Sequence, residues 1–316
     1  MTYGQHESVG SSESGAAKAN AEAASRLQEE NVSACLAGQA IYGDDFGLDQ
    51  IRQWYDDEKE GYADLGAKDR AHYSYSYHEC NRWYGFRHLP KRRWRHVLGL
   101  GSAYGDEFLP IIDSIDRLTI VEPSDQFVSD QVHGVPATYV KPEVSGDLLF
   151  DDGAFDLAVC LRSLHHVPNV SHVVSEMFRC LVPGGFVVLC EPIVSMGDWR
   201  KPRGKLTRHE RGIPLPLFVE SVTRAGFKVE HRNLCNHSVV RLFWSSVLHR
   251  APYNCHSAVL LDDVLSRLTG FHLTYHRTQV AQKLKPASVF LVASKPPTRQ
   301  PDVDKQESMK RLHAAH

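Results

Sequence analysis

Short apolar runs alternate with amphipathic segments through the middle of the chain. Five runs predict strands, the third of them weakly, at 96–100, 117–122, 138–140, 155–161 and 185–191. Three segments with apolar residues at helical spacing predict helices at 105–115, 170–181 and 214–225. Strands that alternate with helices are typical of a parallel sheet with helices on both faces. The pattern therefore predicts an α/β fold.

The remaining segments flank this core. Apolar residues at 239–248 and 259–268 predict two helices, which form either a small subdomain with its own core or a lipid-facing patch. Strands are predicted at 227–231 and 288–293. The division that follows is a disordered N-terminal segment (1–30), a helical lid region (31–95), a core (96–233), a helical cap insertion (234–284), a last core strand (285–296) and a tail (297–316).

A glycine-rich turn follows the first predicted strand of the core. The stretch 96–106 reads HVLGLGSAYGD, and its small residues let the backbone approach a ligand. The next strand ends in Glu122, about twenty residues beyond the turn, where a carboxylate suits a ribose diol. Together these features favour a nucleotide-like ligand at the carboxyl ends of the strands.

An ordered set of motifs makes the assignment specific. In chain order they are GLGSAYG (99–105), VEPS (121–124), DDGAFDL (151–157), LHHV (164–167), LVPGGFVVL (181–189) and EP (191–192). This set resembles the class I S-adenosylmethionine-dependent methyltransferases, in the type 11 methyltransferase domain family. The resemblance implies a Rossmann-like seven-stranded mixed sheet with helices on both faces, a helical lid before it and a helical insertion before the last strand. That last strand would pair antiparallel at the sheet edge.

The same resemblance implies S-adenosylmethionine as the cofactor. Eight residues would lie around it: Gly99, Gly101, Ser102, Ala103, Glu122, Pro123, Asp147 and Leu161. The turn departs from the family pattern at two positions. Ala103 replaces the second glycine of the family's turn, and Gly99 occupies the position at which the family usually carries an acidic residue. Asp106, Glu107 or water are the alternatives for the missing carboxylate.

Candidate catalytic groups follow the strand at 155–161. Methyl transfer is an in-line displacement, and a hydroxyl acceptor is helped by a base; imidazole suits that role. We expect one of His165 and His166 to face the acceptor, with Glu191 orienting it or taking the proton. The alternatives are a structural histidine pair, and a Glu191 that hydrogen-bonds the loop 195–197.

Candidate acceptor-binding groups lie in two other segments. Residues 72–94 crowd aromatic and polar side chains, among them Tyr77 and Trp83, as in a ligand lid or in a helix packed on the sheet. The loop 195–204 is cationic and holds Arg200, which would bind an anionic or sugar-bearing acceptor unless the loop is merely solvated.

Net charge, cysteine spacing and the length of the apolar runs exclude several classes of partner and binding site. The chain has 316 residues and a formal net charge of -2, so it offers no electrostatic case for nucleic-acid binding. Its 7 cysteines form no CxxC pair, and we expect reduced thiols, no metal site and a cytoplasmic protein. No apolar run approaches the roughly 20 residues of a membrane helix, so no integral membrane association is expected. An oligomer remains open.

These features predict a methyltransferase that acts on a small-molecule acceptor, with a hydroxyl oxygen of a sugar or secondary metabolite as the favoured target. Two alternatives stay open. One is N- or C-methylation of a small molecule, and the other is a binding protein that has kept the fold and lost catalysis.

Overall fold

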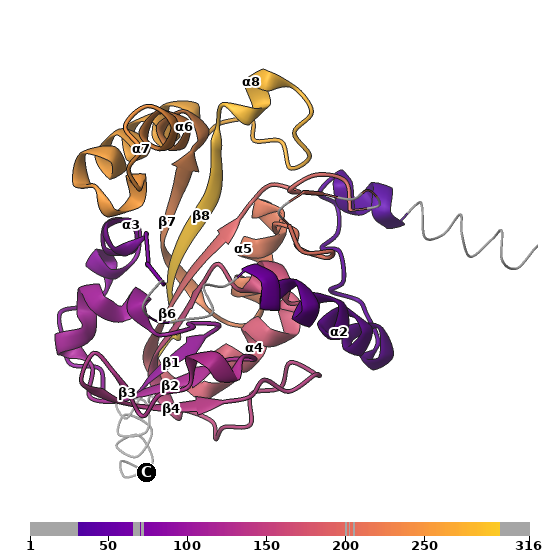
Figure 1. Cartoon of the computed structure of the whole chain (residues 1–316). Helices are drawn as coiled ribbons and strands as arrows, with labels where there is room; N and C mark the ends of the chain where they lie inside the picture. Colours follow the sequence, from indigo (N-terminus) through magenta and orange to yellow (C-terminus); the bar gives the residue numbers. More distant parts are fainter. Residues whose placement is uncertain are drawn as a thin grey trace, which may run out of the picture.

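The computed structural model describes residues 31–65, 70, 73–199, 201, 203–204 and 206–297. The segment 1–30, nearly all of the tail, and Arg200 lie outside the described residues. One sheet organises the fold (Figure 1). Its strands are β1 (Val97–Leu100), β2 (Leu118–Val121), β3 (Gln131–Val132), β4 (Val135–Val140), β5 (Phe155–Leu161), β6 (Leu181–Pro192), β7 (Lys228–His237) and β8 (Pro286–Ser294).

The strand order is β3-β4-β2-β1-β5-β6-β8-β7. Strands β4, β2, β1, β5 and β6 run parallel, while β8 pairs antiparallel with both β6 and β7. The predicted α/β class is confirmed. The strand count is eight rather than seven, because the two-residue strand β3 forms a hairpin with β4. The last strand is antiparallel as expected, but it lies between β6 and β7, so β7 and not β8 forms that edge.

Two apolar cores cover the two faces of the sheet. Successive side chains of a strand point to opposite faces, and in β5 Ala158 and Cys160 pack into one core while Leu157 and Val159 pack into the other. Helices α4 (Val170–Cys180) and α5 (Leu215–Arg224) cover the first face. The second face is covered by α3 (His78–Tyr84), the 3-10 helices η1 (Phe86–His88) and η2 (Asp106–Ser114), and α7 (His256–Thr269).

The segment after the glycine-rich turn differs from the prediction. It is the 3-10 helix η2 instead of an α-helix over 105–115. Pro110 lies inside it, and proline lacks the N–H that an α-helix needs. Its acidic start, Asp106 and Glu107, nevertheless lies beside the turn, as the sequence predicts.

The helical region before the core is anchored to the loops that follow the strands. In α2 (Leu48–Leu65), Trp54 is buried and its indole N–H donates to the carbonyl of His166 (2.7 Å). Arg211 is also buried, and its guanidinium donates to the carbonyls of Tyr42, Leu164, Val167 and Pro168. This region therefore braces the loop 162–168 from behind.

The helical insertion holds α6 (Ser238–Ser246), the 3-10 helix η5 (Pro252–Asn254), α7 and α8 (Val280–Lys283). The insertion does not form a subdomain with its own core, because the apolar side chains of α6 are exposed: Leu242 by 50%, Phe243 by 47% and Val247 by 60%. The outer side of α7 is likewise apolar and exposed, at Leu261 and Val264. No helix in the described part of the chain is both long and apolar enough to cross a bilayer.

One buried carboxylate ties this insertion to the core. Asp262 of α7 accepts hydrogen bonds from the Tyr84 hydroxyl (2.8 Å) and from the backbone N–H groups of Asn236 (3.1 Å) and His237 (2.7 Å). We expect Asp262→Ala to lower the free energy of unfolding by about 3 kcal/mol, because three buried donors lose their acceptor, and Tyr84→Phe by about 1–2 kcal/mol. Urea unfolding followed by circular dichroism measures both; equal losses in the two variants would contradict this account.

Candidate functional site

The glycine-rich turn leaves β1 in a left-handed conformation, at a point where there is no space for a side chain. Gly101 has a φ of 64°, and a Cβ atom there would lie 2.5 Å from the Ser163 hydroxyl oxygen. The Ser163 hydroxyl instead donates to the Gly101 carbonyl (3.2 Å). The turns after β1 and β5 are thereby held together at the carboxyl ends of adjacent parallel strands, where ligands bind in such sheets.

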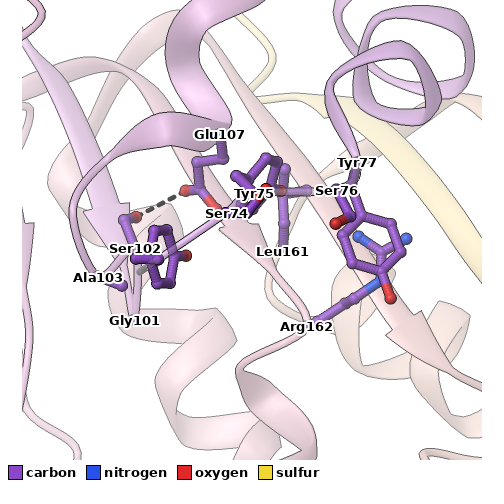
Figure 2. A pocket seen from close by; sticks show the side chains of 11 residues that line it. Ser74, Tyr75, Ser76, Tyr77, Gly101, Ser102, Ala103, Glu107, Leu161 and Arg162 are labelled. Atoms are coloured by element: carbon purple, nitrogen blue, oxygen red, sulfur yellow. Dashed lines mark hydrogen bonds between the residues drawn. The ribbon is translucent and has the colours of Figure 1, made fainter. Parts of the chain in front are cut away.

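A cavity of about 250 Å³ opens at this point (Figure 2). The turn and the end of β5 form one side, and the chain before α3 forms the other. The lining residues are Tyr73, Ser74, Tyr75, Ser76, Tyr77, Gly101, Ser102, Ala103, Glu107, Leu161 and Arg162. Five predicted site residues are among them: Gly101, Ser102, Ala103, Leu161 and Tyr77.

Glu122 contacts one wall of this cavity through Ala103. It is buried, and its two carboxylate oxygens accept the backbone N–H groups of Ala103 (3.0 Å) and Ser124 (3.2 Å). Burial raises the pKa of Glu122. Each carboxylate oxygen can accept more than one hydrogen bond, so Glu122 both shapes the turn and keeps acceptor capacity.

Gly99 leaves no room for the carboxylate that the family usually carries there. A Cβ atom at this position would lie 2.4 Å from the Ser102 hydroxyl oxygen and 3.0 Å from the Phe108 ring. The Ser102 hydroxyl donates to Glu107 (2.6 Å), whose side chain lines the cavity. Burial raises the pKa of Glu107 to about 8.

Asp106, the other candidate for this carboxylate, is engaged elsewhere. It accepts two hydrogen bonds from the Arg70 guanidinium (2.6 and 2.7 Å) and faces His133 at 2.8 Å. These partners hold the pKa of Asp106 below its usual value against the effect of burial. Glu107 is therefore the carboxyl group that the cavity presents.

Arg162 is a cavity residue that the sequence reasoning missed. It follows β5 with a φ of 63°, an uncommon conformation for a residue other than glycine. Its guanidinium lies 3.8 Å from the centre of the Tyr77 ring. Its buried Nη1 atom has no hydrogen-bond partner among the described residues. A buried donor of this kind is costly unless a ligand satisfies it.

The segment before α3 forms the cavity wall opposite the glycine-rich turn, and the insertion contacts this segment. Asn254 of η5 accepts the backbone N–H of His78 (2.8 Å) and donates to the Tyr75 carbonyl (3.0 Å). The Tyr77 ring stacks on the Tyr253 ring, with centres 5.4 Å apart. The insertion thus supports the cavity wall that carries Tyr77.

The predicted catalytic residues form a separate, buried cluster. His165 Nδ1 lies 2.7 Å from Glu191, which also accepts the backbone N–H groups of Ser163 and Leu164. His166 Nδ1 lies 3.2 Å from Glu58 of α2. Burial lowers the pKa of both histidines, that of His165 to about 3, so both rings are neutral. None of His165, His166 and Glu191 is among the cavity-lining residues.

The other predicted site residues lie outside the cavity lining. Trp83 donates to Asp263 of α7 (3.3 Å) and carries the Arg87 guanidinium on its ring. Asp147 is exposed and pairs with His172 (2.7 Å). Pro123 is exposed and follows Glu122, and its carbonyl accepts Lys141.

The cavity residues fit the amino-acid end of S-adenosylmethionine. That end carries an ammonium and a carboxylate; among the residues that line the cavity, Glu107 carries a carboxyl group and Arg162 a guanidinium, whose Nη1 atom is buried without a hydrogen-bond partner. Glu122 lies behind Ala103, at the end of the neighbouring strand, where a ribose diol would be held. A carboxyl group and a guanidinium for the two ends of a zwitterion, and an acceptor for a diol, are thus close to one another.

Comparison with known proteins identifies the central part of the chain. Residues 98–189 match the family model described as a methyltransferase domain. A stretch of 118 residues is 28% identical to the sterol 4-C-methyltransferase strm-1 of Caenorhabditis elegans, covering 34% of this chain. The chain spans about a third of the length of this curated relative (33%).

Solved structures of low identity are also similar. An S-adenosylmethionine-dependent methyltransferase from Mesorhizobium loti is 16% identical, with a TM-score of 0.43, over 66% of this chain and 94% of the other. The N-methyltransferase NodS from Bradyrhizobium japonicum, in complex with S-adenosylhomocysteine, is 13% identical, with a TM-score of 0.40, over 65% of this chain and 79% of the other. From the family match and the ordered motifs, residues 98–189 belong to a methyltransferase domain of the class I S-adenosylmethionine-dependent family.

Proposed function

We propose that this protein transfers the methyl group of S-adenosylmethionine to a small-molecule acceptor, with a hydroxyl oxygen of a sugar or secondary metabolite as the favoured target. The observation that carries the cofactor part is the pairing of Glu107 and Arg162 in one cavity at the carboxyl ends of the strands. A single zwitterionic ligand satisfies both groups at once. A fold that had lost catalysis would have no need to keep an unsatisfied buried guanidinium there.

The chain's own residues bind, orient and exclude water. S-adenosylmethionine, when bound, supplies an electrophilic methyl group on a sulfonium. Glu107 and Arg162 would hold the amino-acid end, and Glu122 with the turn would hold the ribose side. The wall 73–77 covers one side of the cavity. Because an in-line displacement depends mainly on orientation, this enclosure is expected to supply much of the rate.

The proton of a hydroxyl acceptor needs a base, and the histidine cluster is our proposal for it. Glu191 orients His165 through a 2.7 Å contact to Nδ1, the arrangement of a base held by a carboxylate. His166 is held in the same way by Glu58. The two rings lie 4.1 Å apart, and His166 is the better candidate of the two, because it is less completely buried and because burial lowers the pKa of His165 to about 3.

Two measurements test the proposed function. Calorimetry is expected to find one molecule of S-adenosylhomocysteine bound per chain. Incubation with methyl-labelled S-adenosylmethionine and panels of sugars, phenols and amines is then expected to label a hydroxyl compound. Cofactor binding without label in any panel would favour another acceptor class, and the absence of cofactor binding would refute the proposal.

A second candidate, C-methylation of an apolar acceptor, is favoured by two observations. One is the similarity over 118 residues to a sterol 4-C-methyltransferase. The other is the exposed apolar side chains of α6 and α7, which belong to the same insertion as Tyr253, the residue that stacks on Tyr77 of the cavity wall. Label in a sterol, and none in the sugar and phenol panels, would select this candidate.

A further inference from the structure

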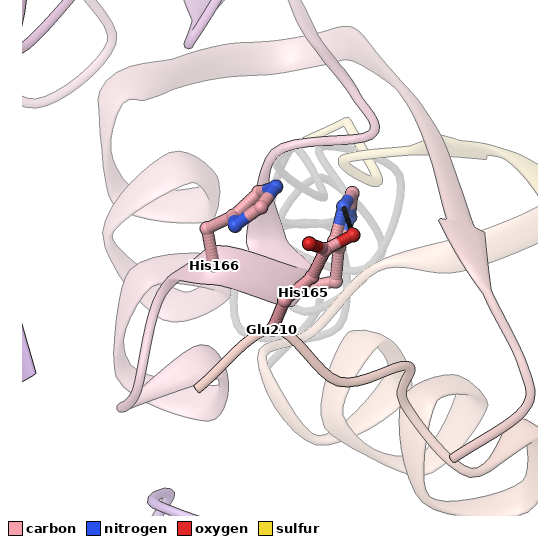
Figure 3. Close-up of side chains that lie close together, drawn as sticks. All are labelled: His165, His166 and Glu210. Carbon is pink, nitrogen blue, oxygen red and sulfur yellow. Dashed lines mark ion pairs between the residues drawn. The ribbon is translucent and has the colours of Figure 1, made fainter. Parts of the chain in front are cut away.

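Two histidines and a glutamate converge in the buried cluster beside the cavity (Figure 3). His165 and His166 belong to the 3-10 helix η4 (Leu164–His166), which follows β5, and Glu210 precedes α5. One ligand atom from each residue lies within 4.8 Å of the others. The sequence predicts no metal site, because Glu210 is more than forty positions from the histidines and no metal-binding motif connects them.

The distance between the His165 and Glu210 ligand atoms is close to that expected for two ligands of one metal ion. His165 Nε2 and Glu210 Oε1 are 3.8 Å apart. This distance is too long for a hydrogen bond. It is close to the roughly 3.4 Å that separates two ligands of a tetrahedral ion with bonds of about 2.1 Å. The pair is therefore spaced to share a cation between its atoms.

Another carboxylate lies next to Nδ1 of each imidazole. Glu191 lies 2.7 Å from His165 Nδ1, and Glu58 lies 3.2 Å from His166 Nδ1. In metal sites, the imidazole nitrogen that does not bind the ion commonly donates to a carboxylate, which fixes the tautomer and the ring orientation. The other oxygen of Glu210 is also fixed, by the backbone N–H of Thr207 (3.1 Å).

The buried negative charge of this cluster also favours a bound cation. Glu58, Glu191 and Glu210 are buried, and no lysine or arginine among the described residues forms an ion pair with them. The nearby guanidinium groups of Arg203 and Arg211 donate to backbone carbonyls instead. Arg203 interacts electrostatically with Glu210 and Glu58, and Arg211 with Glu191, but neither forms an ion pair with these carboxylates. A bound cation would therefore offset a larger part of the cost of burying them.

We propose that His165, His166 and Glu210 bind one divalent transition-metal ion. Two imidazoles and one carboxylate suit Zn²⁺ and its first-row neighbours better than Mg²⁺ or Ca²⁺, which prefer oxygen ligands. Through Glu58 the ion would also tie α2 to the loop after β5. An imidazole that donates one nitrogen to a carboxylate and binds the ion through the other accepts no proton, so for each histidine ion binding and the role of a base are alternatives. This proposal does not depend on methyl transfer.

The test uses the full chain without an affinity tag, stripped with a chelator and titrated with Zn²⁺ in a calorimeter. We expect one high-affinity ion per chain, and a rise in the melting temperature on binding. Glu210→Gln should weaken this binding by about 100-fold or more, and Glu58→Gln by about 10- to 100-fold. Co²⁺ should give an absorption spectrum typical of nitrogen and oxygen ligands in a low-symmetry site.

His172→Asn is the matched control, because His172 is exposed on α4 and pairs with Asp147 away from the cluster. Zn²⁺ binding that is lost in His172→Asn, or kept unchanged in both Glu210→Gln and His166→Ala, would overturn the proposal, as would an absence of stoichiometric binding. Circular dichroism of each variant shows whether it is folded, and Glu210→Gln keeps the side-chain volume in case His166→Ala is not. Binding of S-adenosylhomocysteine, measured separately, reports on the methyltransferase proposal alone.

Discussion

Glu107→Gln is expected to weaken binding of S-adenosylhomocysteine by about 30- to 100-fold at pH 8 and to have little effect at pH 6. The physical reason is the pKa of about 8 that burial gives to Glu107. A charge-assisted pair with the ligand's ammonium contributes roughly 2–3 kcal/mol. Below pH 8 a proton must leave Glu107 before the pair can form, which costs about tenfold in affinity per pH unit.

The pH profile of the unmodified protein follows from the same argument. Affinity should rise toward pH 8 as Glu107 loses its proton, and fall at the higher pH at which the ligand's own ammonium loses its proton. Glutamine resembles the protonated carboxyl group and keeps the Ser102 contact, so the rising limb should disappear in Glu107→Gln. Calorimetry in two buffers with different ionisation enthalpies should detect proton release at pH 7 in the unmodified protein only.

Stability supplies the control for this variant. A carboxyl group whose pKa is raised on folding binds more protons in the native state, so its contribution to stability falls as the pH rises from about 4.5 to about 8. Glu107→Gln removes that cost and should be at least as stable as the unmodified protein at pH 8. Glu230→Gln, on β7 away from the cavity, is the matched substitution. Equal affinity of Glu107→Gln and Glu230→Gln at pH 8 would contradict the role given to Glu107.

Substitution in the histidine cluster is expected to slow turnover at saturating cofactor by about 10²- to 10⁴-fold, the usual contribution of general-base catalysis. His165→Asn, His166→Asn and Glu191→Gln are to be compared singly, with the cofactor affinity of each measured alongside. A loss of kcat with unchanged cofactor affinity is the expected result in at least one of them. His172→Asn, remote from the cluster, controls for the loss of an imidazole.

The opposite outcome is also informative. If none of the three variants slows turnover by more than a few-fold, no base acts from this cluster. An acceptor nitrogen, which needs less help with its proton, would then be favoured over a hydroxyl. The metal content of each preparation should be fixed in this comparison, because His165 and His166 are also the proposed ligands of an ion.

Much of the fold followed from the sequence because its signals are local. The apolar runs predicted the parallel strands of the core, and the spacing of the turn and Glu122 predicted the end of the sheet at which they meet. The insertion of β8 between β6 and β7 could not be derived in this way, because it depends on pairing between distant segments. The helix α6 was predicted at 239–248, but its exposure was left open for a related reason, since apolar residues at helical spacing do not tell whether a partner covers them.

The site was predictable only in part. Ser102, Ala103 and Leu161 line the cavity, and they lie in motifs that could be read directly. Arg162 was missed because its place depends on a positive φ that no pattern signals. The signal for Glu107 was present in the absence of an acid at Gly99, followed by an acidic start to the next helix. Glu58 and Glu210 come from distant segments, and only the folded chain brings them to the histidines.

The central claim is that Glu107 and Arg162 bind the two ends of one zwitterion in front of the turn that Glu122 supports. A crystal structure of the complex with S-adenosylhomocysteine tests it most directly. The account predicts the ligand's amino group within hydrogen-bond distance of Glu107, its carboxylate on Arg162 Nη1 and its ribose beside Glu122. A ligand bound elsewhere, or a cavity that the chain's own side chains still fill in the complex, would contradict it.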